Sequence, residues 1–436
     1  MSQNKIAVLG AGVSGITFAH FLGQEITMFE KEARIGGLCR SFKSREGIFW
    51  DIGPHITFSK DQETLDFMTS LVPMAQIRRS NQIFHKGRYV KYPFENDLSS
   101  LPDEDRDYCL ETFLDNPYEN YPADNMLSFF YKTFGEGITR SFLEPYNRKI
   151  WKYETSFMDT QMVERIPKPP PEDVIKSARG IATEGYKHQL YFHYPVNGGY
   201  QSVVDAILAK TGNIDPLLLD HAIEGVEKTR DKLIVKTKGQ AFEFDHVVST
   251  MPIHELIPMI TPTPPQAVLD ALARLYYNSI HITIVHAEGD HIGDHFALTI
   301  ADPEVPFHRL SRLNFLGESY HNPNSTTLMV EITFRPGLKE DIGPEEVNPL
   351  VVDHLDRLNL VPRDKITSIE TNTFKYAYVI YDLHHRKNTD IVLDYLRSIN
   401  IEPLGRFGTF EYINSDQAIL RARQTAQNWG RTSTSL

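Results

Sequence analysis

Three glycines near the start of the chain have the spacing of a dinucleotide-binding turn. Gly10, Gly12 and Gly15 form a G-x-G-x-x-G motif directly after an apolar strand expected at residues 5–9. In such a motif the first glycine allows a tight turn, the second lets a diphosphate approach the backbone, and the third lets helix and strand pack closely. Glu30 ends the next expected strand, where a carboxylate can accept the ribose hydroxyls. Together these residues predict a Rossmann-type dinucleotide site.

A second glycine pair follows Glu30 and indicates which dinucleotide is bound. Gly36 and Gly37 precede Arg40 in the stretch E-A-R-I-G-G-L-C-R at residues 32–40. Backbone N–H groups beside these glycines can face a flavin, and the arginine can reach the diphosphate as a charge-assisted donor. The stretch resembles a pattern of the FAD family that includes amine oxidases, protoporphyrinogen oxidases and UDP-galactopyranose mutases. The resemblance implies FAD as the cofactor.

Two further segments resemble the UDP-galactopyranose mutases, especially the eukaryotic type. The turn Gly53-Pro54-His55 lies in a D-x-G-x-H-x-x-F segment, which in that family lies against the flavin ring. The resemblance implies that Gly53 and Pro54 contact the cofactor and that His55 tunes its reactive edge. The segment P-Y-N-R-K-I-W contains Asn147 and Trp151, which by the same resemblance line a sugar pocket. Proline at position 54 differs from the family's second glycine, so the base and the sugar stay open.

Two arginines fall where that family binds the substrate diphosphate. Arg165 follows V-E, and Arg309 ends the sequence P-F-H-R. Arginine suits a diphosphate because its planar fork can bind phosphate oxygens with two parallel hydrogen bonds. The resemblance implies that Arg165 and Arg309 meet across a cavity beside the flavin and stabilise the leaving diphosphate.

The last part of the chain continues the resemblance. Tyr378 matches a tyrosine near the substrate diphosphate, and the segment G-R-F-G-T-F-E-Y contains Arg406 and Tyr412. The resemblance implies that Arg406 lies near the flavin and that both tyrosines hydrogen-bond the substrate phosphates. Asp416 and Gln417 open the last expected helix, and the resemblance directs the N–H groups there at the flavin.

The resemblance implies a reaction as well as a cofactor. It predicts a pyranose/furanose mutase for a nucleotide-diphosphate sugar, in which N5 of the reduced FAD bonds the anomeric carbon without net redox change. His55, Arg165 and Arg309 are its catalytic residues, NAD(P)H is a possible reductant, and the pathway is cell-surface polysaccharide biosynthesis. The alternative is an FAD-dependent oxidase or desaturase of the amine oxidase and protoporphyrinogen oxidase type, because the same fold hosts both reactions.

The expected elements predict an α/β fold with a Rossmann-type FAD-binding domain and inserted helical and antiparallel-sheet substrate regions. We expect the FAD-binding domain to comprise residues 1–80, 195–260 and 395–436. A mainly helical substrate domain is expected at residues 81–194, where apolar residues recur at helical spacing. A sheet-containing substrate domain is expected at residues 261–394.

Composition limits the partners. The formal net charge of −12 disfavours nucleic acid, and two cysteines in 436 residues fit a reducing compartment. Because no signal peptide or membrane-length apolar run is found, we expect a cytoplasmic protein with no stable membrane insertion. A homo-oligomer is compatible with the sequence, which leaves the oligomeric state open. His291 and His295 have an i, i+4 spacing, but nearby glycines favour a loop, so no metal is expected.

Overall fold

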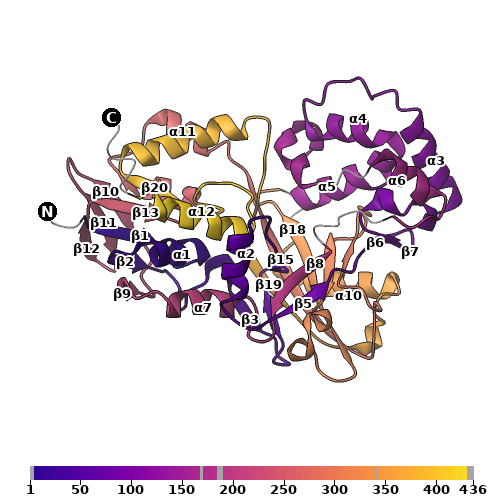
Figure 1. Ribbon diagram of the computed structural model, residues 1–436, viewed down its shortest axis with the longest axis horizontal. Helices are drawn as coiled ribbons and strands as arrows, with labels where there is room; N and C mark the ends of the chain where they lie inside the picture. The colour runs from indigo at the N-terminus through magenta and orange to yellow at the C-terminus, as the bar shows by residue number, and fades with distance from the viewer. Residues whose placement is uncertain (1–3, 167–169, 184–189, 339–341, 430–436) are drawn as a thin grey trace.

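The computed structural model describes residues 4–166, 170–183, 190–338 and 342–429, with the two termini at one end of an elongated molecule (Figure 1). Near that end lies a five-stranded parallel sheet in the order β20-β13-β1-β2-β9. Its strands are β20 (Ile401–Pro403), β13 (His246–Ser249), β1 (Ile6–Leu9), β2 (Ile26–Phe29) and β9 (Ile214–Leu218). Every residue of β1 is buried, as expected for a parallel strand covered on both faces. The predicted Rossmann-type sheet is confirmed.

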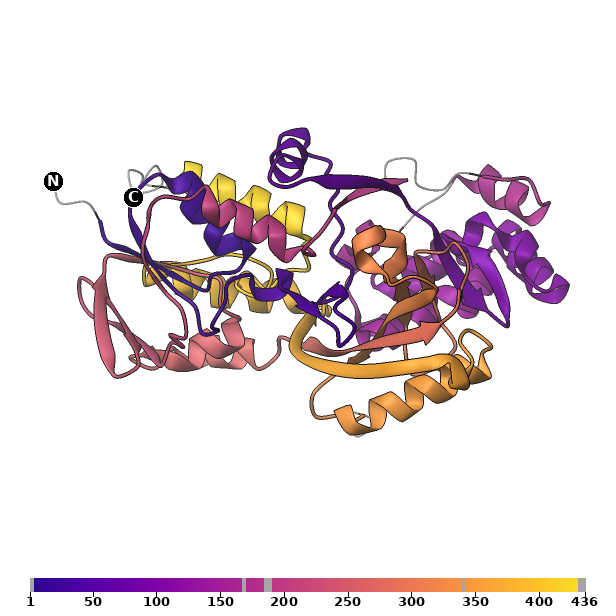
Figure 2. The ribbon, with the colours of Figure 1, turned by 90° about the horizontal axis from the view of Figure 1, so that it is seen from below.

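Helices from distant parts of the chain cover this sheet. Helix α1 follows β1 through the glycine turn and packs against α7 and α12, which Figure 2 shows side by side. The helices of this part are α1 (Val13–Leu22), α2 (Gln62–Thr69), α7 (Gln201–Ala209), α8 (Ile253–Leu256), α9 (Gln266–Leu272), α11 (His385–Ser398) and α12 (Ser415–Gln427). A small sheet adds β12 (Gln240–Phe244), β11 (Leu233–Thr237), β10 (Gly225–Lys228) and β14 (Ile260–Thr261).

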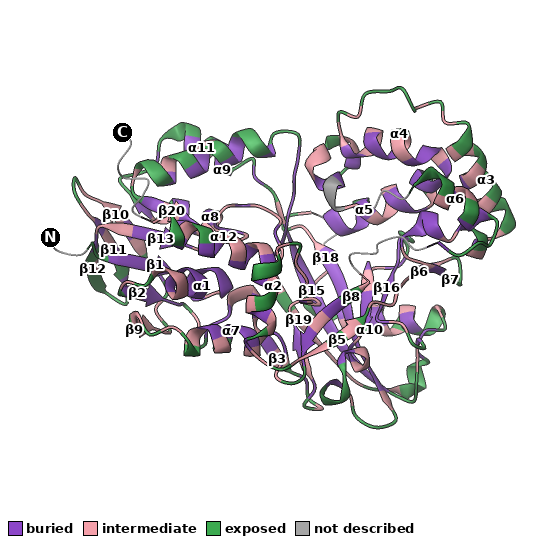
Figure 3. Cartoon of the chain, viewed as in Figure 1, coloured by how far each residue is buried: buried purple, intermediate pink, exposed green. Residues whose placement is uncertain are grey.

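A seven-stranded sheet forms the centre of the other half of the molecule. Its order is β19-β15-β18-β17-β16-β6-β7. The strands are β19 (Ile366–Val379), β15 (Tyr277–Glu288), β18 (Ser325–Phe334), β17 (Arg309–Arg312), β16 (Ala297–Thr299), β6 (Asn81–His85) and β7 (Arg88–Lys91). β15 and β18 are almost wholly buried (Figure 3), and α10 (Pro344–Arg357) packs on β19. Residues 81–91, which we grouped with the helical region, thus lie in this sheet; the domain boundaries otherwise stay predictions.

Helices make up most of the third region, as the apolar spacing predicts. Its elements are α3 (Asp103–Leu114), α4 (Met126–Ile138), the π-helix η4 (Thr139–Leu143), α5 (Glu144–Trp151), the 3-10 helix η6 (Thr160–Arg165) and α6 (Pro171–Ala178). Gly135 interrupts α4 with φ 72°, because the chain passes so close to Thr112 that a Cβ would lie 2.3 Å from its carbonyl oxygen. The turn redirects the chain toward α5, which carries two of the predicted pocket residues.

One buried carboxylate joins the segments that carry the flavin motifs to the rest of the fold. Asp51 ends β4 (Phe49–Asp51), which pairs with β3 (Ser41–Lys43). It accepts hydrogen bonds from Ser41 Oγ at 2.5 Å, from Tyr194 Oη at 2.6 Å and from the backbone N–H of Tyr200 at 3.1 Å. Tyr194 lies in β8 (Tyr191–Pro195), paired with β5 (Met74–Arg78), and Tyr200 precedes α7. The network therefore fixes the loop that begins at Ile52.

Asp51→Asn should change how stability depends on pH. Burial raises the pKa of Asp51 to about 6, although its hydrogen-bond donors favour the ionised form. Because this pKa exceeds the unfolded value of about 4, the folded state holds the proton more tightly, and stability falls as pH rises from about 4 to about 6. Urea unfolding should show a loss on the order of 2 kcal/mol over this range for the wild type but not for Asp51→Asn. Parallel pH profiles would contradict the assignment.

Candidate functional site

A cavity of about 560 Å³ lies where the parallel sheet meets β19, and most of the predicted flavin residues line it. From the predicted set its wall contains Gly10, Gly12, Glu30, Gly36, Gly37, Arg40, His55 and Arg406. The far wall comes from Thr373, Phe374, Lys375 and Tyr376 of β19. The cavity thus lies at the carboxyl ends of β1 and β2, the edge at which open α/β sheets bind their ligands.

The two glycine motifs meet backbone to backbone at the bottom of this cavity. Gly12 and Gly36 form an isolated parallel bridge, and the Gly36 N–H donates to the Ala11 carbonyl at 2.9 Å. Gly36 has φ 120°, and a Cβ on Gly37 would lie 3.1 Å from the Cα of Gly12, so side chains would separate the segments. Gly15 lies outside the cavity, where a Cβ would lie 2.3 Å from the Gly10 carbonyl oxygen. It serves the close helix–strand packing predicted for it.

Glu30 and Arg40 are both fixed by bonds to the glycine segments and to Glu32. The Glu30 carboxylate accepts from the Ala11 N–H at 2.8 Å and from the Glu32 N–H at 3.0 Å. Each oxygen keeps a further lone pair, so Glu30 can still accept ribose hydroxyls. Arg40 Nε donates to the Gly37 carbonyl at 3.0 Å, and its guanidinium lies 3.4 Å from Glu32. These bonds orient the arginine before any diphosphate arrives.

The start of α12 closes the cavity from the opposite side. Asn414, Ser415 and Ala418 line it, whereas Asp416 and Gln417 are outside the residues that form its wall. Arg406 donates from Nε to the Ile413 carbonyl at 2.8 Å and from a terminal nitrogen to the Ala377 carbonyl at 3.2 Å. Arg406 therefore joins β19 to the α12 turn. The cofactor roles of Asp416 and Gln417 stay predictions.

His55 lies on the wall of this cavity, within range of the charges of Arg406 and Arg309. Burial, together with the positive charges of Arg406 and Arg309, lowers the pKa of His55 to about 4. The imidazole is therefore neutral near pH 7. Its Nδ1 is buried and has no well-aligned hydrogen-bond partner among the described residues, although a backbone interaction with Gly53 partly offsets the lowered pKa. The ring packs 5.4 Å from that of Tyr200. The preceding Gly53 has φ 79°, and a Cβ there would lie 3.7 Å from Glu331 Oε2; neither Gly53 nor Pro54 forms part of the cavity wall.

Arg309 is held by a carboxylate that the motifs do not include. Arg309 starts β17 opposite Glu331 of β18. Its Nε and one terminal nitrogen donate to the two oxygens of Glu331 at 2.6 and 2.7 Å. The Glu331 side chain has no exposed surface, whereas 26% of the Arg309 side chain is exposed. The Glu331 charge keeps the pKa of Arg309 high against the cost of burial, so the guanidinium is cationic and oriented.

Three predicted pocket residues form one aromatic cluster next to this pair. The ring centroids of Trp151, Tyr378 and Tyr412 lie 5.6 to 5.7 Å apart. Burial, together with the negative charge of Glu331, holds the pKa of the Tyr378 hydroxyl well above its usual value. Asn147 accepts from Trp151 Nε1 at 2.9 Å and donates to the Leu143 carbonyl at 2.7 Å. Asn147 thus orients the tryptophan; its sugar contact stays a prediction.

The position of the second predicted arginine is known only at the backbone. Arg165 is the last residue of η6, and its side chain lies outside the part of the chain that the structure describes. The predicted meeting of Arg165 with Arg309 therefore stays a prediction.

A different arginine, Arg79, lies near Arg309. It follows β5 directly and is largely buried, and its pKa is lowered by burial and by the charge of Arg309.

Sequence reasoning missed Glu331, Arg79 and Tyr146. Tyr146 interacts electrostatically with Arg309 and Glu331, and burial raises its pKa. For Glu331 a signal exists, since it is the one acid in the apolar strand at residues 327–334, where a charge needs a partner. Arg79 does not belong to a sequence motif that would distinguish it from an ordinary surface arginine.

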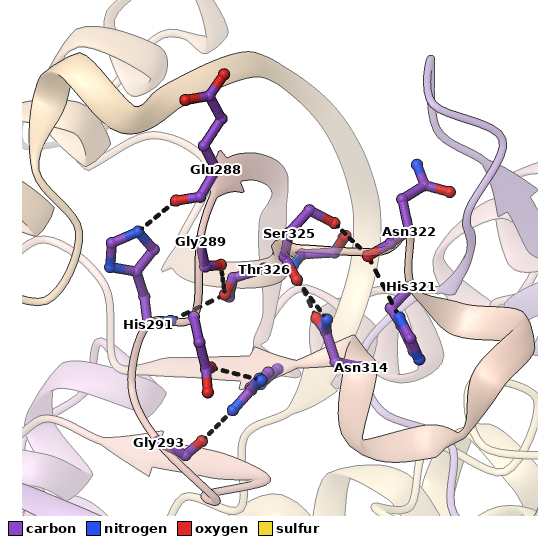
Figure 4. Close-up of polar contacts among 12 residues, drawn as sticks. Glu288, Gly289, His291, Gly293, Asn314, His321, Asn322, Ser325 and Thr326 are labelled. Carbon is purple, nitrogen blue, oxygen red and sulfur yellow. Dashed lines mark hydrogen bonds and ion pairs between the residues drawn. The ribbon is translucent and has the colours of Figure 1, made fainter.

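The histidines near residue 291 lie in a loop. His291 Nε2 bonds the Glu288 carbonyl at 2.7 Å, and the His291 N–H donates to Thr326 Oγ1 at 3.0 Å (Figure 4). Within the described ranges, no group of three or more His, Cys, Asp or Glu side chains is placed to hold a metal ion. None of the helices in those ranges has the length and apolarity needed to cross a membrane.

Comparison with known families identifies the protein class. Residues 14–372, most of the chain, match the model of the flavin containing amine oxidoreductase family. The chain belongs to this family. The crystal structure of reduced UDP-galactopyranose mutase superimposes on this family member with a TM-score of 0.92 and 22% identity, covering 99% of this chain and 97% of the other. The fold predicted from the motifs is thereby confirmed.

Curated relatives match shorter segments of this flavin amine oxidoreductase. Protoporphyrinogen oxidase 2 of Arabidopsis thaliana is 28% identical over 168 residues, 34% of this chain and 32% of that protein. UDP-galactopyranose mutase of Mycoplasma pneumoniae is 36% identical over 66 residues, 14% of this chain and 16% of that protein. The matched segments thus span about a third or less of the length of these relatives.

The cavity fits the flavin dinucleotide of this family. Gly12 faces it with an ordinary φ, and an added Cβ would meet only the Gly37 Cα, at 3.8 Å. The space beside Gly12 is therefore open in the protein, as backbone contact with a diphosphate requires. Gly10, Gly12, Glu30, Gly36, Gly37 and Arg40 would hold the diphosphate and ribose, and Arg406 and His55 would lie toward the flavin ring.

Gly12→Ala should weaken FAD binding while the stability of the folded protein changes little. The added methyl group makes only an ordinary contact within the protein, so thermal stability of the apoprotein should change little. It fills the space of the diphosphate, so FAD affinity should fall at least tenfold in a fluorescence titration. Gly212→Ala is the matched control, because its Cβ likewise makes no close contact, with nothing within 4 Å, and Gly212 lies outside the cavity wall. Equal FAD affinity in both variants would place the cofactor elsewhere.

Proposed function

We propose that this protein is a flavin-dependent pyranose/furanose mutase acting on a nucleotide-diphosphate sugar, an intramolecular transferase similar to UDP-galactopyranose mutase. The observation that carries the proposal is the oriented guanidinium of Arg309. It stands next to the cluster of Trp151, Tyr378 and Tyr412, and its charge reaches His55 on the flavin cavity wall. A cation in this position suits a reaction whose leaving group is a diphosphate.

The proposed role of Arg309 follows from its hydrogen bonds. Two of its five N–H groups bind Glu331, which leaves three for phosphate oxygens. The carboxylate prevents rotation of the guanidinium, so little conformational entropy is lost when the substrate binds. We propose that Arg165 binds the diphosphate from the opposite side, and that Tyr378 and Tyr412 donate to it.

The sugar would lie between the aromatic cluster and the flavin ring. When bound and reduced, the flavin supplies a nucleophilic N5 for the anomeric carbon. His55, neutral at physiological pH, can donate a hydrogen bond without adding positive charge beside that nitrogen. Trp151 gives the ring an apolar wall and is itself fixed by Asn147. Resemblance to the mutases is the support for NAD(P)H as reductant, for a cytoplasmic homo-oligomer and for a role in cell-surface polysaccharide biosynthesis.

The direct test is turnover by the reduced enzyme. The dithionite-reduced protein should convert at least one of a panel of UDP-, dTDP-, GDP- and CDP-pyranoses to the furanose, detected by chromatography, and the oxidised protein should not. Activity in the oxidised state alone contradicts the proposal. Bleaching of the flavin by an amine or a porphyrinogen, with recovery in air, would instead indicate an oxidase.

Arg309→Lys should weaken substrate binding without loss of the flavin. Lysine keeps a positive charge for Glu331 but loses the planar fork, whereas alanine would leave a buried carboxylate unpaired at a cost of about 3–5 kcal/mol. We expect the yellow colour and the thermal midpoint to persist and the affinity for the sugar nucleotide to fall about tenfold or more, measured by calorimetry. Loss of FAD in this variant would show that Arg309 serves the cofactor instead.

A further inference from the structure

Tyr412, part of the aromatic cluster in the proposed substrate site, lies just after a strained turn. The turn follows β20, and its last residue, Phe410, has φ 52°. The Glu411 N–H donates to the Arg406 carbonyl, five residues earlier, at 2.8 Å. This bond is typical of a helical turn that ends in a left-handed residue, where glycine is usual. A residue with a Cβ is strained in that conformation, so Phe410 needs contacts that hold it there.

Buried rings supply those contacts. The Phe410 side chain is fully buried, and its ring centroid lies 5.0 Å from that of His254 and 5.9 Å from that of His385. His385 Nε2 also donates to the Phe410 carbonyl at 2.9 Å. Because a carbonyl only accepts, the proton of this imidazole must lie on Nε2. Burial lowers the pKa of His385 to about 4, so the ring is neutral near pH 7 and keeps this bond.

The next peptide group along the chain is held by Tyr381. Its hydroxyl oxygen accepts the Tyr412 N–H at 2.8 Å. Tyr381 is buried, and its ring centroid lies 4.2 Å from that of His385. The two side chains that hold the backbone on either side of Glu411 thus pack against each other. Without the Tyr381 hydroxyl the turn would keep its strain and lose the bond that fixes the Tyr412 backbone.

The backbone of Tyr381 is bonded to the helical region. Its carbonyl accepts from the Asp159 N–H at 2.8 Å, and the Leu383 N–H donates to the Phe157 carbonyl at 3.1 Å. Phe157 ends the 3-10 helix η5 (Thr155–Phe157), and Asp159 is the N-cap of η6. Tyr381 therefore bonds the helical region through its main chain and the strained turn through its side chain.

We infer that Tyr381 is a positioning residue for Tyr412 and joins the helical region to the proposed substrate site. The inference rests on the proposed function, in which Tyr412 donates to the substrate diphosphate. The Tyr412 ring centroid lies 5.6 Å from that of Trp151, and the Arg406 guanidinium lies over the Tyr412 ring, 4.9 Å from its centroid. A displaced Tyr412 would thus disturb both the aromatic cluster and the arginine on the flavin cavity wall.

Tyr381→Phe in the FAD holoenzyme tests the inference. The change removes the oxygen that accepts the Tyr412 N–H and keeps the ring on His385 and the carbonyl bonded to Asp159. Hydrogen exchange of the Tyr412 amide, followed by mass spectrometry, should rise about fivefold or more, because one buried hydrogen bond is lost. The affinity for inorganic pyrophosphate, measured by calorimetry, should fall by a similar factor. FAD affinity should persist.

Tyr395→Phe is the matched control. It makes the same chemical change in α11, at a partly buried hydroxyl whose pKa is shifted by burial alone, and should alter neither quantity. Unchanged exchange of the Tyr412 amide in Tyr381→Phe overturns the inference. Unchanged pyrophosphate affinity in a variant whose exchange has risen overturns it too.

The exchange measurement needs no substrate, so it separates this inference from the proposed function. If exchange at Tyr412 rises in Tyr381→Phe but the reduced wild type makes no furanose, the proposed function is wrong and the hold of Tyr381 on Tyr412 stands. If the wild type makes furanose but Tyr381→Phe behaves as Tyr395→Phe does, the inference is wrong and the proposed function stands.

Discussion

The bidentate pair between Arg309 and Glu331 is the interaction on which the proposed substrate site depends. A carboxylate with no exposed surface is tolerated in the sheet only because the guanidinium compensates it, and removal of either partner leaves an uncompensated charge. The strand register places the two residues directly opposite each other, and the His308 N–H donates to the Glu331 carbonyl at 3.1 Å. The sheet thus fixes the cation, and the cation in turn defines where an anionic substrate can lie.

The flavin cavity and the substrate site are joined through the segment that follows Asp51. Asp51 anchors its start by three hydrogen bonds, and Gly53 passes close to Glu331. His55 then lies on the flavin cavity wall, within reach of the charges of Arg406 and Arg309. A single loop therefore reaches both the wall of the flavin cavity and the proposed anion site, and its Gly53 adopts φ 79°.

The sequence predicted those features that short-range patterns determine. The Rossmann-type sheet and the glycine segments follow from local spacing, and the structure places Gly12 against Gly36 as the motifs require. The sequence did not predict the role of Glu331 or the strands β6 and β7, because these features depend on pairing between segments far apart in the chain. The helical spacing expected within residues 81–194 did not predict the kink at Gly135 inside α4, since the close approach of Gly135 to Thr112 depends on a neighbouring helix.

Charge also distinguishes the two faces of α5. One face carries the tryptophan of the proposed sugar pocket, and the other carries Arg148 and Lys149. A structure of the reduced holoenzyme with a bound nucleoside diphosphate tests the central claim most directly. The account predicts phosphate oxygens within hydrogen-bond distance of Arg309, with Glu331 still paired behind it and Arg165 on the other side of the diphosphate. A diphosphate bound in the catalytic half without contact to Arg309 would contradict it.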